Sequence, residues 1–243
     1  MMVDMTDTAL AGTALAGLAG LLADRTRATV CLALMDGRAW TAAELARTAG
    51  VARSTATEHL NLLVSGGLLT EVRQGRHRCL RLADHAAELV ERLAAAAPPG
   101  AAAPVRSLTT AHRRRALAAA RTCYDHLAGT LGVAVTDAMT ARGLLSWDRG
   151  LTLTDDGDRW LAALVGAWPP ASRRPLVRSC LDWTERRPHL GGATGAALCS
   201  HAVEAGWVVR SRQSRALRIT DAGRSELRDH LGLELPADVG ARP

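Results

Sequence analysis

Hydrophobic residues recur at helical spacing along the first part of the chain. Leucines three to five positions apart in an Ala-rich run predict a helix over residues 10–22. A second helix is predicted after Asp24, ending at Gly37. The sequence Thr-Ala-Ala-Glu at 41–44 is a capping-box pattern, which predicts a third, short helix ending near Gly50.

A fourth helix is expected from about residue 53 to residue 65, where two glycines end it. With the preceding short helix and its Gly-containing turn, it forms a helix-turn-helix pattern. Ala56, Leu60 and Leu63 fall on one face of the fourth helix, and short hydrogen-bonding side chains occupy the other, as in a recognition helix. The candidate DNA contacts on that polar face are Arg53, Ser54, Thr55, Thr57, Glu58, His59 and Asn61.

Residues 68–73 and 77–82 then alternate in the manner of two β-strands around a turn. This hairpin is basic and has no acidic residue between Val72 and Leu82, so it suits a wing that neutralises phosphates. Its candidate DNA contacts are Arg73, Gln74, Arg76, His77 and Arg78. Any surface helix is polar outside, but a basic hairpin directly after a helix-turn-helix favours DNA binding.

Together these motifs resemble the arsenical-resistance-regulator (ArsR/SmtB) family of winged-helix repressors over residues 10 to 95. The matching motifs are Leu22-Ala23-Asp24-Arg25-Thr26-Arg27, Ala43-Glu44-Leu45-Ala46, Ser54-Thr55-Ala56-Thr57-Glu58-His59-Leu60, Gly67-Leu68-Leu69 and Arg73-Gln74-Gly75-Arg76. The resemblance implies a homodimer joined through the first helix and the helix after the wing, and repression that an effector relieves.

Two departures from that family concern metal sensing. The helix over 41–48 lacks the cysteine pair by which some members bind soft metals. The helix after the wing has Asp84, His85 and Glu91 but no histidine downstream, so the zinc pattern found there in other members is incomplete. Metal sensing at either place is therefore not expected.

The rest of the chain predicts a linker over 97–110 and then an internal repeat. The winged helix-turn-helix DNA-binding domain is assigned to residues 1–96. The C-terminal regulatory region is assigned to 111–235, with repeats at 111–168 and 175–232. Each repeat is expected to run helix, helix, β-hairpin, helix, with Thr154 and Thr220 as N-caps. The predicted fold class is mainly α with small β-hairpin wings (α+β): a winged helix-turn-helix plus two winged-helix-like repeats.

The last hairpin of the second repeat is also basic, with Arg210, Arg212, Arg215 and Arg218. The helix before it offers almost nothing to read bases. We interpret both repeats as winged-helix scaffolds for packing and sensing, and leave an auxiliary phosphate contact from the last hairpin open.

Two cysteines occupy equivalent places in the repeats. Cys123 and Cys180 each stand two residues before an aspartate, and Cys123 and His126 would face one point from a helix. Thiolate and imidazole suit zinc or a similar metal, with Asp125, Asp182 and His189 offering further ligand atoms. A disulfide formed on oxidation and a plain structural role are the alternatives, and all three stay open.

Composition narrows the function classes. The net charge is +6, but residues 1–96 hold ten Arg and ten acidic residues, so the local wing cluster carries the DNA argument. An odd number of cysteines, five, and no secretory signal indicate a cytoplasmic protein, and the apolar stretch over 9–23 is too short to span a bilayer. No nucleophilic triad, phosphate-binding loop or paired-carboxylate motif indicates an enzyme.

We therefore expect a dimeric, effector-responsive repressor that binds double-stranded operator DNA, with a metal, an oxidant or an organic ligand as effector. The alternative is a metal- or thiol-handling protein that uses winged helices to bind other proteins rather than DNA.

Overall fold

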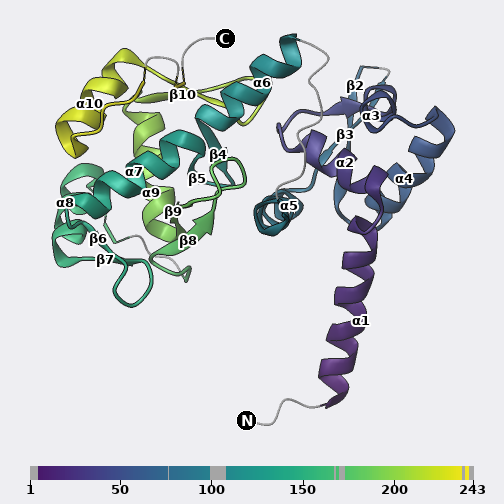
Figure 1. The fold of residues 1–243 in the computed structure, drawn as a ribbon, viewed down its shortest axis with the longest axis horizontal. Coiled ribbons are helices and arrows are strands. Elements are labelled where there is room, and N and C mark those ends of the chain that lie inside the picture. The colour runs from purple at the N-terminus through teal and green to yellow at the C-terminus, as the bar shows by residue number, and fades with distance from the viewer. Residues whose placement is uncertain are drawn as a thin grey trace. The chain divides into compact units, whose positions relative to one another are not determined.

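The computed structural model describes residues 5–75, 77–98, 108–166, 168–169, 173–236 and 239–240. The chain divides into two compact units, Met1–Val90 and Glu91–Pro243, with the division inside helix α5 (Asp84–Ala96) (Figure 1). Most of the predicted linker, residues 99–107, lies outside the described residues. Among the helices described, none has both the length and the apolar character needed to cross a bilayer.

The first unit has the predicted helix-turn-helix followed by a hairpin. Its elements are α1 (Met5–Leu22), α2 (Arg25–Leu34), β1 (Trp40–Thr41), α3 (Ala42–Ala49), α4 (Arg53–Ser65), β2 (Leu69–Gln74), β3 (His77–Leu82) and the first part of α5. The strands form one antiparallel sheet in the order β1-β3-β2. Leucines from α2, α3, α4 and β3 make its core; Leu34, Leu45, Leu60, Leu63 and Leu80 are all 0% exposed.

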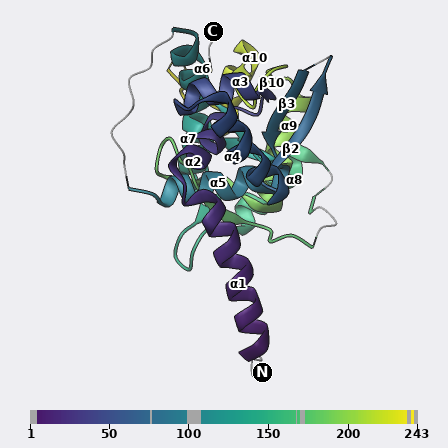
Figure 2. The same cartoon turned by 90° about the vertical axis from the view of Figure 1, so that its right-hand side faces the viewer.

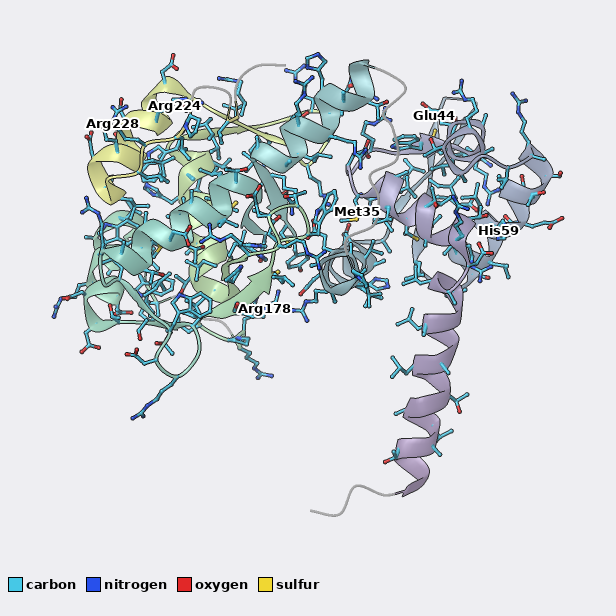
Figure 3. The ribbon with its side chains drawn as sticks, viewed as in Figure 1. Met35, Glu44, His59, Arg178, Arg224 and Arg228 are labelled. Atoms are coloured by element: carbon cyan, nitrogen blue, oxygen red, sulfur yellow. The ribbon has the colours of Figure 1, made fainter. Side chains whose placement is uncertain are left out.

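Local side-chain chemistry fixes where these helices begin. Asp24 caps α2 by accepting a hydrogen bond from the backbone N–H of Arg27 at 2.9 Å. The capping box of α3 is confirmed: Thr41 Oγ1 accepts from the N–H of Glu44, and the Glu44 carboxylate (labelled in Figure 3) accepts from the N–H of Thr41 at 2.8 Å. Gly50 then ends α3 in the left-handed conformation, at φ 72°.

Helix α1 is held at its C-terminal end and exposed along the rest. The Arg27 guanidinium donates to the carbonyl oxygens of Leu21 at 2.6 Å and of Gly20 at 2.8 Å, so a cation lies at the negative end of the helix. Further towards the N-terminus, Leu10 and Leu15 are each 67% exposed. Both views show α1 extending as a lone helix (Figures 1 and 2).

The second unit begins with α6 (Leu108–Ala119), after the last turns of α5, and then follows one pattern twice. The first repeat has β4 (Arg121–Cys123), β5 (His126–Ala128), α7 (Gly129–Ala141), β6 (Leu145–Ser146), β7 (Thr152–Leu153) and α8 (Asp155–Val165). The second has β8 (Arg178–Leu181), β9 (Pro188–Gly191), α9 (Gly192–Glu204), β10 (Val208–Arg210), β11 (Leu217–Ile219) and α10 (Asp221–Leu231). Thr154 and Thr220 cap α8 and α10, as predicted.

The expected order of helix, helix, hairpin, helix is incomplete for the first repeat and wrong for the second. In the first repeat the hairpin β4–β5 separates the two expected helices, α6 and α7, and in the second the hairpin β8–β9 stands in place of the expected first helix. The segments around the two cysteines form these strands. The chain reverses at Tyr124, which has a positive φ of 58°, and at Asp125. Gly129, at φ 74°, then starts α7 where a Cβ would lie 2.4 Å from the carbonyl oxygen of Ala118. Gly192, at φ 80°, starts α9 in the same way.

The first hairpins of the two repeats pack against each other and against the opposite repeat's helix. β5 lies beside β9, while α7 contacts β9 and α9 contacts β5. This exchange gives the second unit a local pseudo-two-fold arrangement, with the residues of both first hairpins at its centre.

Candidate functional site

The polar face of α4 points to solvent. Ala56, Leu60 and Leu63 are buried in the core, whereas the side chains on the opposite face are open. Of the predicted contacts, the exposed ones on α4 are Arg53, Ser54, Thr57, Glu58 and Asn61. Ala52, which precedes the helix, makes no side-chain cap, so no side chain at the N-cap competes for the first N–H groups. The start of α4 is thus open to an anion.

Thr55 and His59 are only partly exposed. His59 (labelled in Figure 3) is turned toward the start of α2. Its Nδ1 lies 3.4 Å from Arg27 Nη1 and 3.6 Å from Asp24 Oδ1. The sequence predicted His59 to be a DNA contact, whereas its described partners are Arg27 and Asp24 of the same chain.

A side-chain hydrogen bond links the wing to α4. Arg78 of β3 donates from Nη2 to Asn61 Oδ1 at 3.1 Å and also forms an ion pair with Glu71 of β2. The hydrogen bond from Arg78 holds the pKa of Glu71 below its usual value. Sequence reasoning missed Glu71, which stands one residue before the acid-free run. Part of the positive charge of the wing is therefore neutralised within the protein by Glu71.

The remaining candidate DNA contacts on the wing are described by the structure to different extents. Arg73 is opposite Arg78 in the register and is exposed, as is Arg81. Gln74 and His77 form the last backbone pair of the hairpin. Arg76 lies outside the described residues. Two cationic side chains near α4 are thus open to a phosphate backbone.

The last hairpin of the second unit, proposed as an auxiliary phosphate contact, is less basic on its surface than its sequence indicates. Arg215 turns inward, with Nη1 2.9 Å from Glu91 Oε1 and 3.2 Å from the carbonyl oxygen of Thr122.

The second candidate site is a buried cluster of two cysteines and two histidines. The expectation that Cys123 and His126 share a helix is wrong: they are directly opposite each other on β4 and β5. Cys180 and His189 form the equivalent pair on β8 and β9. Direct cross-strand partners project from the same side of a hairpin, so the cysteine and the histidine of each pair lie side by side. One ligand atom from each of the four residues lies within 4.8 Å of all the others.

Charged groups surround this cluster. The Cys123 thiol donates to the Glu91 carboxylate, and its Sγ lies 3.9 Å from Cys180 Sγ. Hydrogen-bonding contacts with Cys123 and with both histidines hold the pKa of Cys180 below that of a free thiol. His126 Nδ1 lies 3.3 Å from Asp125 Oδ1, and His189 Nδ1 lies 3.7 Å from Asp182 Oδ2. Sequence reasoning selected Cys123, His126 and Cys180 and mentioned His189 only as a further source of ligand atoms.

The fold and the exposed face of α4 define a winged helix-turn-helix DNA-binding protein. Residues 22–72 match the family described as a helix-turn-helix domain. Over 225 residues the chain is 39% identical to YdfF of Bacillus subtilis (strain 168), an uncharacterised HTH-type transcriptional regulator, and the match covers 91% of this chain and 98% of that one. The chain belongs to this family of HTH-type transcriptional regulators. The predicted helix-turn-helix transcriptional regulator is confirmed.

Two solved structures also match part of the chain. The homodimeric winged helix-turn-helix domain of Mb0332 from Mycobacterium bovis, a possible ArsR-family regulator, is 26% identical and covers 37% of this chain and 81% of its own, with a TM-score of 0.32. The cadmium metal-sensor CMTR from Mycobacterium tuberculosis is 30% identical and covers 38% and 98%, with a TM-score of 0.30.

Proposed function

We propose that this regulator is a dimeric repressor that binds an operator through α4 and the wing and responds to an effector through its second unit. The observation that carries the proposal is the exposed polar row on α4, joined to the basic wing by the hydrogen bond between Asn61 and Arg78. Such a protein acts on double-stranded DNA, and we place it in the cytoplasm.

The side chains of that row have the chemistry to read DNA. Serine, threonine and asparagine bind base edges in the major groove, where an α-helix fits. Arg53 stands at the first position of α4, where phosphate binding is favoured by the helix dipole. Arg73 and Arg81 add positive charge for the sugar-phosphate backbone, which fixes the register of the helix in the groove.

The wing is tested by Arg73→Ala. We expect operator and unrelated DNA to lose affinity alike, and the salt dependence of binding to become shallower by about 0.9 in the log–log slope, because one phosphate contact is lost. Arg76→Ala is expected to do the same. Fluorescence anisotropy titrations at several salt concentrations measure both quantities.

Arg159→Ala is the matched control, since it removes the same charge from an exposed position, 74% open at its side chain, in the second unit. It is expected to leave the slope unchanged. A wild-type slope in Arg73→Ala would contradict the wing assignment.

The dimer is tested on α1. Leu10 and Leu15 are strongly exposed on a lone helix, so we propose that the partner subunit covers them. Replacing both with glutamate places like charges at that interface and is expected to weaken dimerisation by about 100-fold or more. Analytical ultracentrifugation gives the dissociation constant. Leu176→Glu, at a leucine 44% exposed in the second unit, is expected to stay dimeric. Unchanged dimerisation of the α1 variant would exclude this interface.

A further inference from the structure

We propose that Cys123, His126, Cys180 and His189 bind one divalent metal ion of the zinc class with tetrahedral geometry, and that this ion joins the first hairpins of the two repeats. The proposal does not depend on DNA binding, and it concerns neither of the metal positions that the family resemblance brought into question.

The distances between the four ligand atoms fit a tetrahedral site. The two Sγ atoms are 3.9 Å apart and the two Nε2 atoms 3.2 Å apart. Bonds of about 2.3 Å from zinc to sulfur and about 2.0–2.1 Å to nitrogen, at tetrahedral angles, give edges of about 3.8 Å and about 3.3 Å. A disulfide would require the sulfurs to approach to about 2.05 Å. The sulfur atoms thus stand at the spacing of two ligands on one ion.

The two histidines present one ring nitrogen each to a common position. Their Nε2 atoms lie 3.2 Å apart, and both imidazoles are 0% exposed. His126 Nδ1 lies 3.3 Å from Asp125 Oδ1, the arrangement by which a carboxylate orients a metal-bound imidazole. His189 Nδ1 lies 3.7 Å from Asp182 Oδ2, beyond hydrogen-bond distance, and has no hydrogen-bond partner among the described residues. An ion bound between the rings would take one electron pair from each Nε2.

Charge and ligand type select the ion. Two thiolates neutralise a divalent cation, so the loaded site places no net charge among buried groups. Sulfur and imidazole ligands favour zinc, cobalt or cadmium over magnesium or calcium. Because four protein groups complete the coordination, the site resembles closed structural zinc sites rather than catalytic ones.

The repeat explains how the site is built. Each repeat supplies one cysteine and one histidine, and a glycine of the other repeat's helix lies beside each histidine. A Cβ on Gly195 would lie 3.1 Å from the Cβ of His126, and one on Gly132 would lie 3.7 Å, an ordinary van der Waals distance, from the Cβ of His189. The metal would therefore crosslink the two halves at the centre of the pseudo-two-fold arrangement.

The test is metal analysis of the full chain purified under reducing conditions, followed by removal of the metal and titration with Co²⁺. We expect one ion per chain and the visible absorption of tetrahedral, thiolate-ligated cobalt. Cys180→Ser and His189→Ala are expected to lose stoichiometric binding. Cys199→Ser, which removes a buried thiol outside the cluster, is expected to keep it.

The variant His189→Cys separates loss of a metal ligand from failure of a variant to fold. A third thiolate is expected to retain one cobalt ion and to strengthen the thiolate-to-metal absorption, which a structural role for His189 alone would not produce. Failure of the wild-type chain to bind zinc or cobalt would overturn the proposal. So would binding retained in Cys180→Ser, or loss of Cys123 and Cys180 from the titratable thiols as a disulfide in the metal-free protein.

Discussion

Replacing Asp182 with asparagine is expected to destabilise the second unit by about 3–5 kcal/mol, because the change leaves a buried cation without its main partner. The Asp182 side chain is 0% exposed and accepts from Arg121 Nη2 at 2.8 Å and from the N–H of Gly129 at 2.7 Å. Arg121 is itself buried, with Glu91 as its other acid at 3.5 Å. Asparagine keeps the shape but not the charge.

Urea unfolding followed by tryptophan fluorescence measures this effect, since Trp40 is the one tryptophan outside the second unit. A chelator keeps the proposed metal from contributing. Asp137→Asn is the matched control: its ion pair with Arg187 is 3.0 Å long, but both side chains are at least half exposed. The control is expected to change stability by less than about 1 kcal/mol. Equal effects of the two substitutions would contradict the role given to the buried pair.

The ion pair between Asp182 and Arg121 also predicts that the stability of the second unit depends on pH. Burial raises the pKa of Asp182, but Arg121 and hydrogen bonds from Thr184, Glu185 and Gly129 outweigh it and hold the pKa well below its usual range. A lowered pKa in the folded state adds stability that is fully present above the unfolded value of about 3.9 and is lost as the pH falls below it. The wild-type chain is therefore expected to lose more stability than Asp182→Asn on acidification below about pH 4.

In the first unit, local chemistry made the sequence informative. Asp24 and the Thr41–Glu44 capping box mark helix starts through hydrogen bonds within one turn, so they can be found without a fold. The strand alternation of the wing is equally local. The pairing of Arg78 with Glu71 and the inward turn of His59 depend on which elements meet in space, and no spacing rule contains that information.

In the second unit, the repeat identified the equivalent cysteines but not their backbone. Strands as short as β4, three residues buried throughout, show no alternation that separates them from helix. The missed signal was the pair of glycines, Gly129 and Gly192, that start both helices just after the cysteine segments. His189 was harder to select because Cys123 and His126 are separated by two residues, whereas Cys180 and His189 are separated by eight. The two pairs become equivalent only in the folded hairpins, where each cysteine lies directly opposite its histidine.

Removing the hydroxyl of Ser54 and the amide of Asn61 together is expected to lower operator affinity by about 100-fold while binding to unrelated DNA falls far less. Each lost base contact costs about 1–3 kcal/mol of discrimination, whereas the phosphate contacts from the wing remain. Alanine favours the helix at both positions, so α4 is expected to stay folded. Competition titrations with operator and unrelated duplexes give the specificity ratio.

Ser65→Ala provides the control on the same helix, because its hydroxyl is exposed at the C-terminal end and bonds to the carbonyl oxygen of Leu62. It is expected to bind like the wild-type chain. Asn61 also holds Arg78, so Ser54→Ala alone separates base reading from any movement of the wing. If the single and double variants kept the wild-type specificity ratio, α4 would be a backbone-binding helix and the operator would be read elsewhere. A fall in the ratio with an unchanged salt slope assigns reading to α4 and clamping to the wing.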